Sequence, residues 1–172
     1  MRTALKPFLR YLLVAIGSAA LTVGVFHFVL QPFEVMGLSM APTLEDRDYL
    51  LVDRLFFKER GLRRGDIVVF RLRDGSPFLV KRVVGIPGDT LSIRDGLLFV
   101  NGRPQGMPEL KLSSVRPFGP ASVPPGRFFC LGDNGPSSKD SRTFGPIPLD
   151  RIYGRAVYRY LPLGRSGPIS ER

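Results

Sequence analysis

Ser39 is the residue whose surroundings best suit a chemical role. It lies between Gly37 and Pro42, shortly after an apolar segment that ends at Leu30. A serine among turn-forming residues, just outside such a segment, suggests a nucleophile held at a membrane surface. The same position also suits a serine that caps a helix or turns the chain before a proline.

A serine hydroxyl is a weak nucleophile until a base removes its proton. The single histidine, His27, lies inside the apolar segment, where a neutral polar residue near the outer interface is the simplest interpretation. The base must therefore be a lysine, an aspartate or a glutamate. A lysine can serve when burial lowers its pKa toward neutrality, because desolvation disfavours the ammonium form.

Four of the five lysines occupy unsuitable places. Lys6 precedes the apolar segment, Lys58 stands in a charged turn, Lys111 falls among prolines and Lys139 lies in a polar loop. Only Lys81 occupies an apolar run of β-like character. We therefore take Lys81 as the candidate general base, with a solvated edge-strand lysine as the competing interpretation.

The run 78–84 holds two adjacent cations, Lys81 and Arg82, and both of its faces carry apolar neighbours. Alternation along a strand leaves open which of the two points inward. Chemistry favours Lys81 for the site, since arginine is not deprotonated in proteins.

A third stretch, residues 132–142, is dense in turn-forming residues, which alone predicts only a surface loop. Asp140 and Arg142 can pair to brace this loop. Ser138 or Ser141 can hydrogen-bond the lysine and orient it.

The element that must hold this site at a membrane is Tyr11–Leu30, which contains no Asp, Glu, Lys or Arg. A helix of that length spans about 30 Å, the thickness of the bilayer hydrocarbon. Arg2, Lys6 and Arg10 precede it and place the N-terminus in the cytoplasm by the positive-inside rule. A cleaved secretory signal is the alternative, but its apolar core is shorter, about 7–15 residues, and a small-residue cleavage site follows.

Composition bounds the remaining possibilities. A chain of 172 residues fits one domain plus an anchor, and its 19 Gly and 16 Pro favour a turn-rich β fold. The net charge is +10, and the basic residues are scattered and mostly paired with nearby acids. This pattern favours an anionic membrane surface over nucleic acid as the partner. Cys130 is the only cysteine, so neither an intrachain disulfide nor a His/Cys zinc site is expected. We predict no metal and no cofactor.

Short β-like runs bounded by turn residues follow the anchor. They predict strands at 49–55, 66–71, 78–84, 90–94, 97–100, 127–131 and 152–160. Asp95-Gly96 predicts a two-residue hairpin turn. The fold class is therefore mostly β, preceded by one transmembrane helix.

The domain organisation follows from these elements. We expect a cytoplasmic basic N-terminus at 1–10, an anchor at 11–30 and an extracytoplasmic β catalytic domain at 31–162. Residues 101–126, rich in proline, are expected to form an insertion in that domain. Residues 163–172 are expected to be a polar tail.

Four stretches, taken together, resemble the bacterial type I signal peptidases (leader peptidases). The stretches resemble four sequence boxes of that family and occur in the same order, at Gly37–Leu44, Arg64–Phe70, Lys81–Asp89 and Gly132–Arg142. The resemblance implies a bacterial inner-membrane endopeptidase with a mostly antiparallel β catalytic domain. Such an enzyme cuts signal peptides from exported preproteins after small residues.

The resemblance also implies a role for each site residue. Ser39 attacks the scissile carbonyl and Lys81 is the general base. The hydroxyl of Ser138 orients the lysine amine, Asp140 and Arg142 form a supporting ion pair, and Asp133 shapes the loop.

The backbone N–H of Ser39 supplies one oxyanion-hole donor by the same resemblance. Some relatives add a serine hydroxyl at the position of Gly37, and here that side-chain donor is missing. An extended substrate would place alternate side chains in pockets, for which we expect Met36, Met40, Val80 and Val83.

Several alternatives stay open. A maturation peptidase dedicated to a pilin or a conjugation substrate would carry the same dyad. A non-catalytic anchored β-domain that binds exported proteins belongs to a different class. Phe56 and Phe57 fit either the core or a membrane-contacting surface, and the sequence leaves the oligomeric state open.

Overall fold

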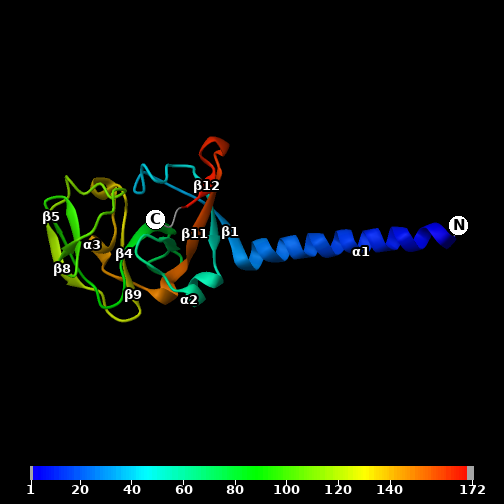
Figure 1. Cartoon of the computed structure of the whole chain (residues 1–172), viewed down its shortest axis with the longest axis horizontal. Coiled ribbons are helices and arrows are strands. Elements are labelled where there is room, and N and C mark those ends of the chain that lie inside the picture. The colour runs from blue at the N-terminus through cyan, green and yellow to red at the C-terminus, as the bar shows by residue number, and fades with distance from the viewer. Residues whose placement is uncertain (1, 170–172) are drawn as a thin grey trace.

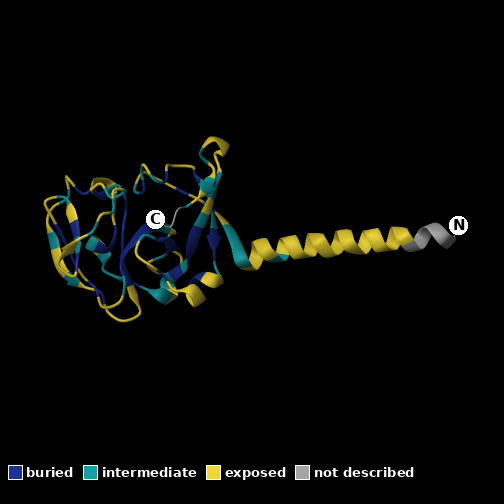
Figure 2. Cartoon of the chain, viewed as in Figure 1, coloured by how far each residue is buried: buried dark blue, intermediate teal, exposed yellow. Residues whose placement is uncertain are grey.

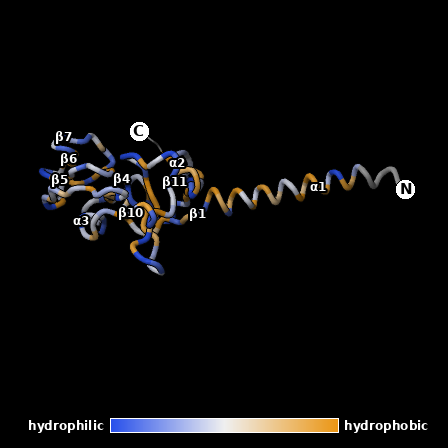
Figure 3. The backbone as a smooth tube through the Cα atoms, turned by 90° about the horizontal axis from the view of Figure 1, so that it is seen from below, coloured by the Kyte–Doolittle hydropathy of each residue, from blue (hydrophilic) through white to orange (hydrophobic). Residues whose placement is uncertain are grey.

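The computed structural model describes residues 2–169, with side chains described from residue 7. A long N-terminal helix stands away from a β-rich body (Figure 1). This helix is α1 (Arg2–Gly24), and a π-helical turn, η1 (Val25–Val29), continues it. Figure 2 shows α1 exposed where its side chains are described, and Figure 3 shows that it is largely apolar.

The apolar part of this helix is long enough to cross a membrane. The span runs from Pro7 to Val29, with a mean hydropathy of 2.1 and none of it buried. The predicted segment ended at Leu30, but Leu30 already begins a strand, β1 (Leu30–Glu34). Sequence reasoning missed β1 because it contains Pro32, and β1 tolerates this proline because it is the edge strand of its sheet.

The main sheet has the strand order β1-β2-β11-β3-β4-β9-β10, with β12 paired to β11. All of its strand pairs are antiparallel, which confirms the predicted fold class. The remaining strands of this sheet are β2 (Tyr49–Asp53), β3 (Ile67–Phe70), β4 (Leu79–Gly85), β9 (Arg127–Leu131), β10 (Ile147–Pro148), β11 (Ile152–Leu161) and β12 (Gly167–Pro168).

A second, smaller sheet has the order β7-β6-β5-β8. Its strands are β5 (Thr90–Arg94), β6 (Leu97–Val100), β7 (Arg103–Pro104) and β8 (Phe118–Ser122). Residues 101–126, predicted as an insertion, thus contribute β7 and β8 to a sheet that also contains the preceding β5 and β6. In the predicted tail, η4 (Leu163–Arg165) and β12 fold back on β11, and residues 170–172 lie outside the described part.

Short helices complete the body: α2 (Phe56–Arg60), η2 (Gly135–Ser137), α3 (Ser141–Phe144) and η3 (Leu149–Arg151). Of the two phenylalanines on α2, Phe57 is fully buried in the core and Phe56 is 40% exposed. Phe57 is therefore a core residue, and a membrane contact of Phe56 stays a prediction.

Strand β4 is central to the core. Val83 on one face belongs to a cluster with Val68, Phe70 and Cys130. Val84 on the other face packs in a second cluster beneath the small sheet. Because both faces of β4 are covered, adjacent residues on this strand are both buried.

Candidate active site

Ser39 lies in the loop between β1 and β2. Gly37 has φ +87°, a conformation that a side chain would strain, and its N–H donates to Asp46 Oδ1 at 2.6 Å. The Ala41 N–H donates to the Leu38 carbonyl at 3.2 Å. These bonds hold the backbone on both sides of the serine.

Lys81 reaches Ser39 from the centre of the main sheet. Its Nζ lies 2.5 Å from Ser39 Oγ and donates to the Val80 carbonyl at 3.0 Å. Lys81 is only 3% exposed. Burial lowers the pKa of Lys81 below its usual value, while the carboxylates of Asp140 and Asp133 oppose this shift. The lysine amine is thereby biased toward the neutral form that a general base requires.

The surroundings of Lys81 explain this bias. Val68, its partner across β3 and β4, is fully buried, and so are Val83 and Cys130. Burial also raises the pKa of the Cys130 thiol, which keeps the thiol neutral. The amine therefore stands at the edge of an apolar cluster with few groups to solvate a charge.

The second cation on β4, Arg82, has a different partner. Its Nε and Nη2 donate to the two carboxylate oxygens of Asp133 at 2.8 and 2.7 Å. Both side chains are buried, with 6% and 0% exposed. The sequence left open which cation points inward, and the structure buries both, on opposite faces of the strand.

The loop that follows β9 carries Asp140 and Arg142. Arg142 Nε lies 2.7 Å from Asp140 Oδ1, and Asp140 is fully buried. The other carboxylate oxygen accepts from the Gly132 N–H at 3.1 Å. The hydroxyl of Ser141 accepts from the Cys130 N–H at 3.0 Å. These bonds fold the loop against the end of β9, on the same side as Lys81.

Ser138 is half-buried, and its hydroxyl oxygen is buried close to the nucleophile. A Cβ built on Gly132 would contact Ser138 Oγ and would lie 2.5 Å from the Ser39 carbonyl oxygen, so only glycine fits between them. Among the described residues, Ser138 Oγ has no hydrogen-bond partner. The predicted bond from Ser138 to Lys81 is thus not formed in this structure, where the Val80 carbonyl accepts from the amine instead. The orienting role of Ser138 stays a prediction.

Asn134 connects these parts, although sequence reasoning gave it no role. Its backbone N–H donates to the Ser39 carbonyl at 3.0 Å, and its Nδ2 donates to the Leu38 carbonyl at 3.1 Å. The signal was its position next to Asp133 in the turn-rich loop, but the sequence did not show that the loop lies against the serine.

The four residues predicted to line substrate pockets lie in three different settings. Met40 is buried and Val80 partly buried, and both pack in the cluster near β2. Val83 lies in the cluster on the other side of β4. Met36 is 85% exposed. Only Met40 and Val80 are therefore brought together.

Comparison with known proteins identifies the family of this chain. The sequence matches the family described as signal peptidase, peptidase S26, over residues 7–161. The chain belongs to this family. It is a serine endopeptidase, and its family membership supports the removal of signal peptides.

Relatives include a signal peptidase I of Leptolyngbya laminosa, 36% identical over 88% of this chain and 79% of the relative. A signal peptidase IB of Staphylococcus aureus is 35% identical over 78% of this chain and 80% of the relative. The crystal structure of a signal peptidase I from Enterococcus faecalis V583 is 28% identical, with a TM-score of 0.46. The aligned region covers 55% of this chain and 96% of the chain in that structure.

Proposed function

We propose that this chain is a membrane-anchored signal peptidase that cleaves exported preproteins with Ser39 as nucleophile and Lys81 as general base. The observation that carries the proposal is the 2.5 Å separation of Ser39 Oγ and Lys81 Nζ, formed by a lysine that is 3% exposed. This distance is within hydrogen-bond reach of a nucleophile and its base.

The reaction begins with neutral Lys81. The amine takes the proton of the Ser39 hydroxyl as Oγ attacks the scissile carbonyl carbon, and a tetrahedral intermediate forms. The resulting ammonium returns this proton to the leaving amine as the peptide bond breaks. Water then hydrolyses the acyl-enzyme, again with Lys81 as base.

The oxyanion of the intermediate needs a donor, and we assign the Ser39 N–H. Within the described residues this N–H has no acceptor in the protein. It shares a planar peptide unit with the Leu38 carbonyl, so the N–H and the carbonyl point in opposite directions. Asn134 Nδ2 and the Ala41 N–H both donate to that carbonyl, and they thereby fix the direction of the Ser39 N–H.

A neutral amine has two N–H donors and one lone pair. The lone pair of Lys81 accepts the serine proton, and one N–H donates to the Val80 carbonyl. The buried hydroxyl of Ser138 is the acceptor that we assign to the second N–H during the reaction, after its side chain rotates. Asp140, Arg142 and Asp133 position the loop that holds this hydroxyl and Asn134.

The anchor brings this site to its substrates. The helical span ends at Val29, and β1 begins at Leu30, so no linker separates the anchor from the domain. By the positive-inside rule, we place residues 1–10 in the cytoplasm and residues 31–162 outside the bacterial inner membrane. Signal peptides emerge from the membrane as extended chains near that outer surface, and the tethered site meets them there.

Substrate specificity follows from pairing with an exposed strand edge, which sends alternate side chains to the same face. Met40 and Val80 are the residues that we place beside the pocket for the side chain before the cut. A narrower substrate range, as in a pilin or conjugation maturation peptidase, would use the same residues.

The test is cleavage of several unrelated preproteins in detergent by the wild type, Ser39→Ala and Lys81→Met. We expect cleavage by the wild type alone. Equal cleavage by all three chains would refute the dyad. Cleavage of a single preprotein would indicate a dedicated maturation peptidase, and cleavage of none would indicate a binding domain.

A further inference from the structure

A cationic cavity lies outside the site described above, between α2 and the loops that flank β3 and β11. Its volume is about 330 Å³. Four cations line it, Arg54, Lys58, Arg71 and Arg151, against two carboxylates, Asp74 and Asp150. The lining therefore has an excess of positive charge.

Arg54 connects this cavity to the end of the anchor. Its Nη1 donates to Gln31 Oε1 at 3.0 Å and to the His27 carbonyl at 3.4 Å. Its guanidinium lies 4.4 Å from the centre of the Tyr153 ring. His27 belongs to η1, the last turn of the apolar span, so the cavity lies at the level where the span ends.

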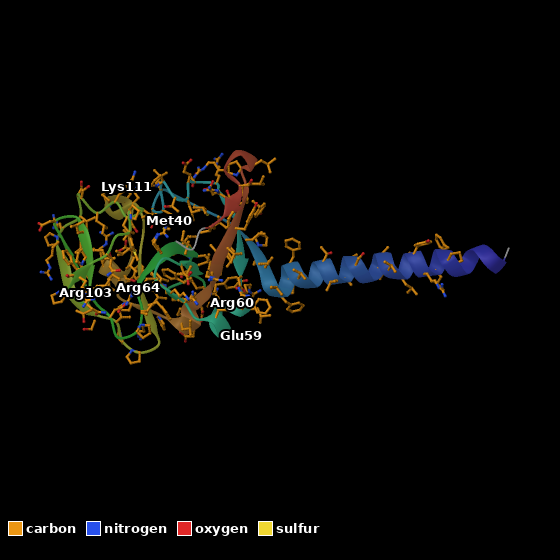
Figure 4. The ribbon with its side chains drawn as sticks, viewed as in Figure 1. Met40, Glu59, Arg60, Arg64, Arg103 and Lys111 are labelled. Atoms are coloured by element: carbon orange, nitrogen blue, oxygen red, sulfur yellow. The ribbon has the colours of Figure 1, made fainter. Side chains whose placement is uncertain are left out.

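The figures agree with this placement. Helix α2 lies beside the end of α1 in Figure 1. Figure 4 shows Glu59 and Arg60 of α2 on the side of the body from which α1 leaves, and Arg103 at the opposite end. A bilayer around α1 would therefore place its headgroups against α2 and its cavity.

The rim of the cavity is apolar as well as basic. Leu55 and Phe56 at the start of α2 are 48% and 40% exposed, and Phe78 is 38% exposed. Phe57, fully buried, fixes α2 to the core. Cations beside exposed apolar side chains match the two parts of a lipid, a charged headgroup and its acyl chains.

The acidic residue that most directly opposes an anion is Asp74. It lies 2.9 Å from Arg151 and 3.9 Å from Arg71. Its side chain is 84% exposed, and ion pairs of such exposed groups contribute little. A phosphate can displace this carboxylate and bind both arginines, because a planar guanidinium group can donate to two phosphate oxygens at once.

We propose that this cavity binds the phosphate of an anionic phospholipid headgroup at the outer face of the membrane. The proposal rests on the anchored topology of the proposed function. A lipid, and not a free phosphate, is the occupant because the cavity continues directly from the anchor and has an apolar rim. Binding there would hold the domain in one orientation against the membrane.

The experiment uses the full chain in lipid nanodiscs of phosphatidylcholine, with increasing shares of phosphatidylglycerol. A fluorescent label is attached to Phe56→Cys, and lipids that carry a nitroxide on the headgroup quench it. The native Cys130 is buried and should not react. We expect quenching to rise with phosphatidylglycerol and to fall when salt is added.

Two matched variants then test the charges in this labelled chain. Lys58→Gln/Arg71→Gln removes two cations from the cavity, and Arg94→Gln/Arg103→Gln removes two from the small sheet. Each cation near an anionic surface changes such an equilibrium about fivefold, so the first variant should lower the ratio of lipid-contacting to free label about 25-fold. The second variant should leave this ratio unchanged.

Three outcomes would overturn the proposal. They are equal quenching with and without phosphatidylglycerol, an equal loss in both double variants, and lipid contact that stays unchanged while soluble glycerol phosphate occupies the cavity at matched ionic strength. The last would indicate a free-phosphate site. A separate label at Phe28→Cys reports on the anchor. If quenchers on the acyl chains do not quench this label, the anchored topology is refuted. If only the label at residue 56 does not respond, the lipid site alone is refuted.

Discussion

Replacing Ser138 by alanine should move stability and activity in opposite directions. The Ser138 hydroxyl is buried and has no hydrogen-bond partner among the described residues. A buried hydroxyl without a partner costs about 1–3 kcal/mol of stability. Alanine removes the oxygen and keeps the Cβ, so we expect the free energy of unfolding to rise by about 1 kcal/mol. In a domain of this size the melting temperature should rise by about 3 °C.

Activity should fall in the same variant. When Lys81 takes the proton of Ser39, the amine becomes an ammonium, and its bond to the Ser138 hydroxyl becomes charge-assisted. Hydrogen bonds to charged groups contribute about 1.5–3 kcal/mol, so kcat should fall about tenfold to a hundredfold.

The assay pairs thermal unfolding of the full chain in detergent with steady-state cleavage of one preprotein. Ser137→Ala is the matched control, because Ser137 is the exposed neighbour of Ser138. The control should change neither quantity. A loss of more than about 1 kcal/mol of stability in Ser138→Ala would show that the hydroxyl is bonded in the folded state. An unchanged kcat would refute its role in orienting the lysine.

Four further predictions concern the dyad and the groups around it. Activity should rise with pH as Lys81 loses its proton, with an apparent pKa below the usual lysine value, because burial lowers the pKa of this amine. A flat profile of kcat/KM would contradict a titrating lysine, provided chemistry limits the rate. Because of the same shift, the unfolded chain binds more protons than the folded chain at pH values between the lowered pKa and the ordinary lysine pKa. The free energy of unfolding of the wild type should therefore rise with pH in that range. Lys81→Met should not show this rise. Asp133→Asn leaves the charge of Arg82 buried without its partner and should cost about 3–5 kcal/mol in thermal unfolding. The double variant Arg82→Met/Asp133→Leu should recover most of this loss, and failure to do so would mean that the ion pair itself is needed. Asn134→Ala removes one of the two donors to the Leu38 carbonyl and should lower kcat about tenfold at unchanged KM, since a misdirected oxyanion donor weakens transition-state binding alone. A change confined to KM would place Asn134 in substrate binding instead.

The strands were predictable from the sequence because their signals are local. Each of the seven predicted strands is present, with bounds within two residues of the prediction. The turn at Asp95-Gly96 is confirmed as well, with positive φ at both residues and Arg94 paired to Leu97. Alternation of side chains and turn chemistry act over a few residues, and a single sequence displays them fully.

The contacts of the candidate site were less predictable because they join distant parts of the chain. Elimination among five lysines selected Lys81, but its approach to Ser39 depends on how the loop after β1 folds over β4. The pairing of Arg82 with Asp133 and the two bonds from Asn134 depend on the same packing. No local pattern encodes these distances.

The two adjacent cations on β4 show why the strand must lie at the centre of the body. In the proposed mechanism Lys81 must lose its proton, so it needs an apolar environment in which the ammonium is disfavoured. Arg82 keeps its charge and therefore needs a buried carboxylate, which Asp133 supplies. An edge strand, exposed on one side, would hydrate one of these groups. Because both faces of β4 are covered, one residue can be buried as a neutral amine and the next as a paired cation. Arg82 also binds Asp133, the residue before Asn134, and Asn134 donates to the backbone of Ser39.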